Sequence, residues 1–427
     1  MELTLEQQQY RQKLFVELLR DNTAYVIQQI NNSITIGDLQ LPLVRRATAG
    51  LCCISKDGHR CPAGWQVQEL GTRGKVGVPY IVRRGGRRVL VKTSEYKGSI
   101  VTMGRSISGD NVLELDEFTN ETIIAYILNY VFDRQRLTPL VIRHLDAVQC
   151  QVISTGYNVM ELANGGNLQG LDIVLRHLRH DSDGNGEGKV VGIFHQVLTQ
   201  ILVCLRFVQQ KCQFTSGDLK AENVVIDHTP IDSVYDLGDR QVRIESNFRC
   251  LLVDFGKCSA TMTNTQTGQP FRIHSSNNIF NAFKRVTGEI PNDPDAVYYR
   301  LQGAMTGHLA QARHGSYRYY PSFDWYTLML SLLTLPTFRD IMFGLDTNNS
   351  LKQIWWYPLW TSVEQADRME NKIMSFYPSR LRTIMQPLSM LQDETLKASL
   401  DDMVDAAFPI RQRESEREVT ACEITPS

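Results

Sequence analysis

Two short acidic motifs, a fixed distance apart, constrain the fold of this 427-residue chain more than any other feature. The first runs from Gly217 to Asn223 and reads Gly-Asp-Leu-Lys-Ala-Glu-Asn, and the second is Asp254-Phe255-Gly256, thirty-one residues after Asn223. An apolar Leu-Leu-Val run directly precedes the second motif and is typical of a buried strand. Either motif alone would be a weak signal, so it is their order and spacing that count.

Phosphoryl transfer is the chemistry that these residue types suit. The reaction needs a carboxylate that receives the proton of the acceptor hydroxyl, oxygen ligands that hold magnesium, and a lysine that pairs with the phosphates. Asp218 is the candidate carboxylate, and Asn223 and Asp254 offer the oxygen ligands. Lys92, after an apolar Leu-Val pair, is the candidate lysine. The plainer alternatives are an ordinary polar loop and a solvated strand lysine.

Hydrophobic periodicity predicts strands early in the chain and helices later. Val76, Val78, Tyr80 and Val82 alternate with other residues, as a half-buried strand does. Residues 190–208 carry apolar side chains at intervals of three and four, which predicts an amphipathic helix. Further strands are expected at 89–91, 148–153 and 157–162, helices at 4–31 and 116–132, and a loop or hairpin at 228–243. Residues 257–320 are expected to be irregular, and the charged tail 411–427 to be disordered.

With these elements around them, the motifs resemble the eukaryotic-type Ser/Thr protein kinases in a divergent form. The resemblance runs from about Leu70 to Leu335. Asp324-Trp325, at the start of an apolar stretch, looks like the beginning of the family's central large-lobe helix. The motif residues that match the family are Asp218 as the catalytic carboxylate, Lys220 as the lysine that accompanies it, and Asn223 and Asp254 as the magnesium ligands.

The resemblance also implies a set of nucleotide-binding residues. Lys92 matches the lysine that pairs with the α- and β-phosphates, and Glu121 is its expected carboxylate partner. Residues 71–76 would cover the phosphates, although the full glycine motif is not present and the loop is two residues short. The positions that follow from the match are Gly71, Gly74 and Val76 in this cover, and Met160, Glu161 and Leu162 in the segment that joins the lobes, with Met160 as gatekeeper.

Three departures from the family pattern affect regulation. Ser216-Gly217 stands where the family usually has His-Arg, so a phosphate on the segment after Asp254 would lack its usual arginine partner. The Ala-Pro-Glu signature is not recognisable, and Pro321 alone stands near its place. The segment from Asp254 to Pro321 is also longer than usual. Such drift is typical of kinases from large DNA viruses.

The fold implied by the resemblance is α+β and two-lobed, with a small antiparallel β-sheet lobe and a larger, mainly helical lobe. The expected divisions are an N-terminal helical extension at 1–64, the small lobe at 65–162, the large lobe with insertions at 163–410 and the tail at 411–427. The implied activity is ATP- and Mg²⁺-dependent phosphoryl transfer to protein substrates, with the nucleotide near Glu161. Lys220 favours Ser or Thr over Tyr as the acceptor.

Two other functions remain open. A small-molecule kinase of the aminoglycoside or choline type often has Gly before the catalytic Asp, as at Gly217. However, those enzymes usually carry His two residues after that Asp, where this chain has Lys220, and they lack Asp-Phe-Gly. A catalytically weak pseudokinase or virion-associated structural protein would suit the incomplete glycine motif.

Composition adds a few exclusions. The formal net charge of −1 gives no reason to expect nucleic acid or an anionic membrane as a partner. No signal-peptide pattern or long uncharged apolar stretch is apparent, so we expect a cytoplasmic protein, in the host cytoplasm or virion if the source is viral. Nine scattered cysteines, an odd number, favour reduced thiols, and the group at 52–61 lacks the spacing of a zinc site.

Overall fold

The computed structural model describes residues 34–35, 45–46, 54–55, 58–59, 65–70, 77–84, 86–95, 102–105, 111–150, 155–180, 186–264, 270–275, 321–345, 350–375 and 399–409. The helix expected at 4–31, the phosphate cover at 71–76 with Gly71, Gly74 and Val76, and the tail at 411–427 lie outside these residues. The described residues form a mixed α+β protein. The chain divides into two compact units. Unit 1 comprises Met1–Val131, Ile142–Leu162 and Asp254–Asn278, and unit 2 comprises Phe132–Val141, Ala163–Val253 and Ile279–Ser427.

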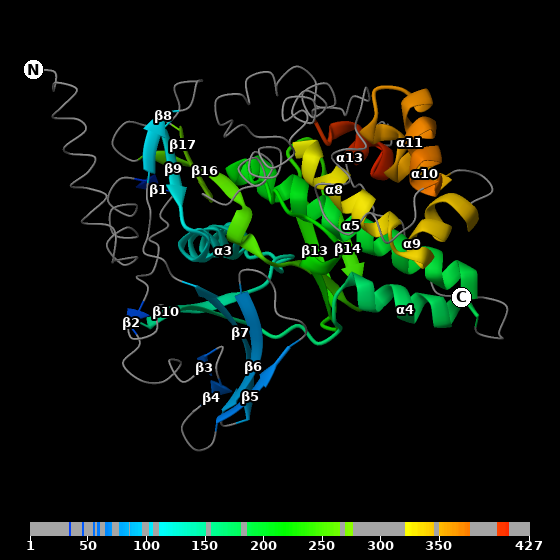
Figure 1. Ribbon diagram of the computed structural model, residues 1–427. Coiled ribbons are helices and arrows are strands. Elements are labelled where there is room, and N and C mark those ends of the chain that lie inside the picture. Colours follow the sequence, from blue (N-terminus) through cyan, green and yellow to red (C-terminus); the bar gives the residue numbers. More distant parts are fainter. Residues whose placement is uncertain are drawn as a thin grey trace, which may run out of the picture. The chain divides into compact units, whose positions relative to one another are not determined.

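Unit 1 contains a six-stranded sheet (Figure 1). Its order is β2-β10-β11-β7-β6-β5, and all neighbours are antiparallel except β2 and β10. The strands β6, β7, β10 and β11 agree with the expected strands. The bounds are β2 (Arg45–Arg46), β5 (Trp65–Glu69), β6 (Gly77–Arg84), β7 (Arg87–Glu95), β10 (His144–Cys150) and β11 (Thr155–Met160).

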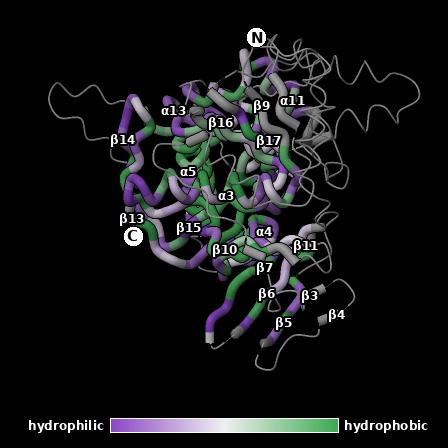
Figure 2. Tube along the Cα trace, turned by 90° about the vertical axis from the view of Figure 1, so that its left-hand side faces the viewer, coloured by the Kyte–Doolittle hydropathy of each residue, from purple (hydrophilic) through white to green (hydrophobic). Residues whose placement is uncertain are grey.

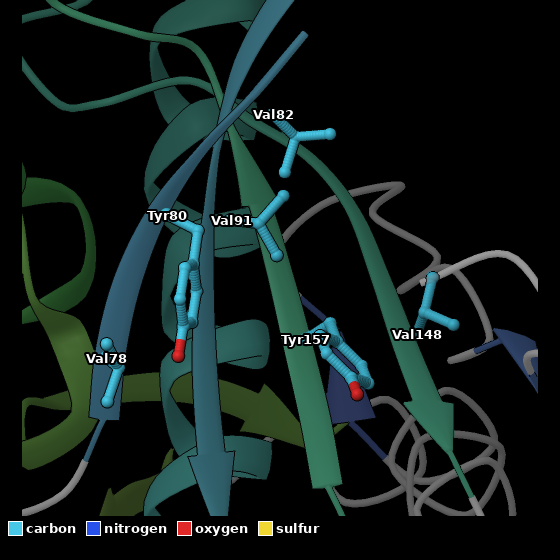
Figure 3. Packing of buried hydrophobic residues seen from close by; sticks show 6 residues of the cluster. All are labelled: Val78, Tyr80, Val82, Val91, Val148 and Tyr157. Carbon is cyan, nitrogen blue, oxygen red and sulfur yellow. The ribbon is translucent and has the colours of Figure 1, made fainter. Parts of the chain in front are cut away.

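Alternation along β6 builds the core of this sheet. Every second side chain from Val78 to Val82 is buried and packs with apolar side chains from β7, β10 and β11. Figure 3 shows these side chains on one face of the four strands. Burial of a large apolar side chain is worth about 1.5–3 kcal/mol, so this cluster fixes the strand register that places Lys92. The cluster consists of Val78, Tyr80, Val82, Val91, Val148 and Tyr157.

A second, five-stranded sheet in unit 1 joins segments that are far apart in the chain. Its order is β1-β16-β17-β9-β8, and β17 runs parallel to β9. The prediction of an irregular segment at 257–320 was wrong for residues 259–264 and 270–275, because these form an antiparallel hairpin that pairs with β9. The bounds are β1 (Ile34–Thr35), β8 (Thr102–Arg105), β9 (Asn111–Leu115), β16 (Ser259–Asn264) and β17 (Pro270–Ser275). A two-residue pair, β3 (Ile54–Ser55) and β4 (Gly58–His59), forms a separate ladder.

The helix α3 (Glu117–Arg134) follows β9 after a single residue, Asp116. The Asp116 carboxylate accepts hydrogen bonds from the backbone N–H and the hydroxyl of Thr119, at 3.1 and 2.6 Å. This is the side-chain cap expected at a helix N-terminus. The helix predicted at 116–132 is therefore confirmed, and its start is fixed directly after the sheet.

Helices make up most of the described part of unit 2. The long helix α5 contains the predicted amphipathic stretch, and the hydropathy colouring of Figure 2 shows its apolar character. Its length and composition would also suit a membrane span, but 61% of its most apolar window is buried inside the protein, which accounts for that composition. The bounds are α4 (Leu168–Arg179), α5 (Gly186–Cys212), α8 (Pro321–Leu333), α9 (Pro336–Asp340), α10 (Ser350–Trp355), α11 (Val363–Ser375) and α13 (Asp401–Ala407).

Two short antiparallel ladders complete unit 2. The strand β12 (Val224–Asp227) directly follows Asn223 and pairs with β15 (Arg249–Leu252), which lies just before Asp254. The segment between them contains the hairpin of β13 (Ile231–Asp236) and β14 (Gln241–Ser246), which confirms the hairpin alternative predicted at 228–243.

Candidate functional site

Lys92 lies in the middle of β7, and two carboxylates from other elements meet its ammonium group. Lys92 Nζ is 2.9 Å from Glu121 Oε1 on α3 and 2.6 Å from Asp254 Oδ1. All three residues belong to unit 1. The side chains of Lys92 and Glu121 are only 15% and 1% exposed, whereas that of Asp254 is 36% exposed. The structure thus brings together three of the residues singled out by the sequence.

Burial and charge act against each other in this group. Burial by itself would lower the pKa of Lys92, but the carboxylates of Asp254 and Glu121 hold that pKa above its ordinary value. Burial raises the pKa of Glu121, and the charge of Lys92 opposes that rise. Each charge compensates the desolvation of the other, so the removal of one partner leaves a buried, unpaired charge.

Asn158 on β11 fixes the second oxygen of Glu121. Its Nδ2 donates to Glu121 Oε2 at 3.2 Å, and its Oδ1 accepts from the Thr122 hydroxyl at 2.9 Å. His144 Nε2 lies 3.0 Å from the same Oδ1. Burial lowers the pKa of His144 to about 4, so at neutral pH the ring is uncharged and its Nε2–H donates to Asn158. These contacts set the orientation of the Asn158 amide, and through it that of the Glu121 carboxylate.

Asp254 begins a tight turn that we call the Asp254 turn (residues 254–258). The backbone of Asp254 is left-handed, with φ 64° and ψ 72°, a region that non-glycine residues seldom occupy. Gly256 packs closely on α3, because a Cβ there would lie 2.6 Å from Cγ of Glu117. The Nδ2 of Asn120, also on α3, lies within 3.2 Å of three backbone carbonyls of the turn. Glycine at this position thus lets the turn lie close to the helix that carries Glu121.

In unit 2, residues 216–223 form what we call the Asp218 loop. The buried Asp324 carboxylate, on α8, accepts hydrogen bonds from the backbone N–H groups of Ser216 and Gly217, at 2.7 and 2.9 Å. The Ser331 hydroxyl, on the same helix, accepts one from the backbone N–H of Ala221 at 2.9 Å. Gly217 has φ 65°, a conformation that favours glycine, which accounts locally for glycine at this position.

The candidate side chains of this loop lie close to one another. Asn223 Nδ2 donates to the backbone carbonyl of Asp218 at 2.8 Å, so that bond does not use the amide oxygen of Asn223. Lys220 Nζ is 3.9 Å from Asp218 Oδ2 and 3.3 Å from Glu222 Oε2. The Lys220 side chain is 32% exposed and that of Asp218 only 7%. The loop therefore places a carboxylate, an ammonium group and an amide oxygen within one short segment.

The three residues expected to join the lobes lie at the end of β11 and just after it. Met160 is its last residue and is buried. Glu161 exchanges two hydrogen bonds with Arg143: its backbone N–H donates to the Arg143 carbonyl at 2.9 Å, and its Oε1 accepts from the Arg143 N–H at 3.0 Å. Unit 1 is left after Leu162. The Glu161 carboxylate is thus used to fix the backbone at this exit.

The proposed magnesium ligands have the right chemistry. Carboxylate and amide oxygens are hard ligands of the kind that Mg²⁺ prefers. Asp254 belongs to unit 1 and Asn223 to unit 2. Within the described ranges, no group of three or more His, Cys, Asp or Glu residues could hold a metal ion by itself.

Comparison with known proteins finds a viral relative. No protein-family model matches the chain. A protein of Acanthamoeba polyphaga mimivirus, named a putative serine/threonine-protein kinase, is 28% identical to it over 40% of this chain. The match covers 27% of the relative, so the chain spans about a quarter of that protein's length. The relative's name indicates a kinase-like relationship. Its viral source agrees with the departures from the kinase pattern, which are typical of kinases from large DNA viruses.

Proposed function

We propose that the protein is an ATP- and Mg²⁺-dependent kinase that transfers the γ-phosphoryl group to Ser or Thr residues of protein substrates. The observation that carries the proposal is the contact of Lys92 with both Glu121 and Asp254. A buried ammonium group shared by a carboxylate from a helix and one from a strained turn is costly to maintain. It is also the arrangement that phosphoryl transfer requires of a phosphate-binding lysine and a metal-binding carboxylate.

Each residue then has a defined task. Lys92 holds the α- and β-phosphates, and Glu121, fixed by Asn158, keeps that lysine in place. Asp218 accepts the proton of the substrate hydroxyl, and Lys220 neutralises charge on the transferred phosphoryl group. Asp254 and Asn223 each offer an oxygen ligand to magnesium, which when bound would supply neutralisation of the phosphate oxygens.

The function is tested by transfer of label from γ-labelled ATP to a generic protein such as casein, followed by identification of the labelled amino acid. Wild type should label Ser or Thr. Asp218→Asn keeps the shape of the side chain and removes its basicity, so transfer should fall about 100-fold or more. Asp232→Asn is a matched control, because it makes the same chemical change on the exposed β13–β14 hairpin. It should leave the rate unchanged.

Nucleotide binding is measured separately by thermal shift with and without Mg²⁺. Wild type that binds ATP but labels no protein would support the pseudokinase alternative. Labelling of an aminoglycoside or choline in preference to protein would support a small-molecule kinase. Equal labelling by wild type and Asp218→Asn would show that the base has been assigned wrongly.

A further inference from the structure

The side chain of Asn120 contacts three backbone carbonyls of the Asp254 turn. Its side chain is fully buried on α3, next in sequence to Glu121. Nδ2 lies 3.2 Å from the carbonyl oxygens of Phe255 and Gly256 and 2.9 Å from that of Cys258. An amide nitrogen has two hydrogens, so three carbonyls share them. One side chain therefore gathers most of the carbonyls of this turn at a single point on the helix.

These hydrogen bonds act directly after a strained residue. Left-handed backbone at a non-glycine residue such as Asp254 persists only where the surroundings over-determine it. The Asn120 bonds reach residues one, two and four positions beyond Asp254, and the close packing of Gly256 on Glu117 adds a steric constraint from the same helix. The direction of the Asp254 carboxylate is thus tied to α3.

The backbone ties the same two elements together by another route. The strand β16 begins at Ser259, immediately after the turn, and pairs with β17. In turn, β17 pairs with β9, which leads through the cap residue Asp116 into α3. The helix α3 and the Asp254 turn are therefore joined twice, by the Asn120 side chain and by the pairing of β16, β17 and β9. A shift of α3 would therefore carry Glu121 and Asp254 together.

We propose that Asn120 is a positioning residue that holds the Asp254 carboxylate in register with Glu121. Lys92 then meets both carboxylates without any modification of the segment that follows the turn. The inference rests on the proposed function, and it assigns a regulation to that site: the phosphate-binding group is assembled permanently. Such a device suits a chain that has Gly217, with no side chain to bind a regulatory phosphate, in the Asp218 loop.

The test compares Asn120→Ala with Asn129→Ala in the full chain. Asn129 lies on the same helix and is also buried. It donates to the carbonyls of Ala125 and Ile142 and accepts from the backbone N–H of His144, all away from the turn. Asn120→Ala should lower kcat about tenfold or more and raise the Mg²⁺ concentration for half-maximal rate about tenfold, while KM for the protein substrate stays within about twofold, since only the metal-binding carboxylate is misplaced. Asn129→Ala should lose stability to a similar extent, but its magnesium requirement should stay at the wild-type value.

Hydrogen–deuterium exchange gives a readout that does not depend on activity. Peptides covering residues 254–264 should exchange faster in Asn120→Ala than in wild type, and at the wild-type rate in Asn129→Ala. If the wild type transfers no phosphate but Asn120→Ala still exchanges faster than wild type, the positioning role stands and the kinase proposal fails. An active wild type whose Asn120→Ala variant keeps the same magnesium requirement and the same exchange would overturn the positioning role alone.

Discussion

The candidate residues of the two units are held in opposite ways. In unit 1 the candidate side chains hold one another: Lys92, Glu121 and Asp254 form a largely buried group of charges. In unit 2 the contacts that fix the Asp218 loop go to its backbone, from Asp324 and Ser331 on α8. The charges that would act in catalysis are thus structural in unit 1 and largely separate from the structure in unit 2.

This difference has a practical consequence for mutagenesis. A substitution in the Lys92 group should alter stability and chemistry together, because it unpairs a desolvated charge. A substitution of Asp218 should alter the chemistry alone. A substitution of Asp324 or Ser331, which hold the loop backbone, should alter the structure. Four substitutions, ordered by the expected loss in free energy of unfolding, test this division.

The largest loss is expected for Asp324→Ala. It removes the acceptor of two charge-assisted hydrogen bonds from buried backbone N–H groups. At about 1.5–3 kcal/mol for each such bond, the free energy of unfolding should fall by about 3–6 kcal/mol in urea titrations. Asp324→Asn keeps one acceptor oxygen and should lose about half as much. A loss below about 1 kcal/mol for Asp324→Ala would show that the loop backbone has other support.

Lys92→Met should come next, with a loss of about 3 kcal/mol at pH 8, because Glu121 is left buried without its cation. The loss should shrink at pH 5. Burial raises the pKa of Glu121 in the folded state. The neutral carboxyl group is tolerated below that pKa, and the free energy of unfolding falls as pH rises and the buried group ionises. The double variant Lys92→Met/Glu121→Leu should recover the stability but not the activity. If the double variant is as unstable as the single one, the pair does not set the stability of this region.

Titration of His144 should have an effect at most about as large as that of Lys92→Met, and only at acid pH. Its folded pKa of about 4 lies below the ordinary 6.5, so the unfolded chain binds more protons between these values. The free energy of unfolding should therefore fall as pH drops from 6.5 to 4, by up to about 3 kcal/mol for this group. His144→Gln keeps an N–H donor for Asn158 without a titrating ring. Between pH 6.5 and 4 its free energy of unfolding should fall less than that of wild type, by this amount. If the two proteins lose stability in parallel over this range, His144 is not the group responsible.

The smallest loss is expected for Asp218→Asn. The loop backbone keeps its bonds to Asp324 and Ser331, and the exchanged atoms have the same size. The free energy of unfolding should change by less than about 1 kcal/mol, since the contact with the half-exposed Lys220 is weak. Denaturation midpoints measured beside the transfer rates would check this. A loss as large as that of Asp324→Ala would remove the contrast between the units.

Local patterns predicted much of this fold and several of the candidate residues. Strand alternation, helix periodicity and the spacing of the two motifs are properties of short stretches, so β6, β7, α3 and α5 were predictable. These signals need no knowledge of which distant segments meet. The contact between Lys92 and Glu121 agrees with a pairing that the resemblance to protein kinases implied, and no local pattern indicated it.

The residues that the sequence reasoning missed act through distant partners. Asn158 matters because it lies opposite Lys92 in the β11–β7 register, and Asn120 because a turn 135 residues later packs on its helix. The pairing of β17 with β9 is equally invisible locally, and residues 270–275 resemble a polar loop until their neighbour is known. In hindsight, the alternation of Phe271 and Ile273 was the available strand signal.

The pairing of β17 with β9 also sets the order in which the protein can fold during synthesis. Phe271 pairs with Asn111, which leaves the ribosome 160 residues earlier. Until then the β8–β9 hairpin has an unpaired edge, open to the strands of other nascent chains. Parallel pairing over such a separation is slow because a long loop must close first. Completion of unit 1 is therefore a late event, and the yield of folded protein should depend on how well chaperones shield that edge in the interval.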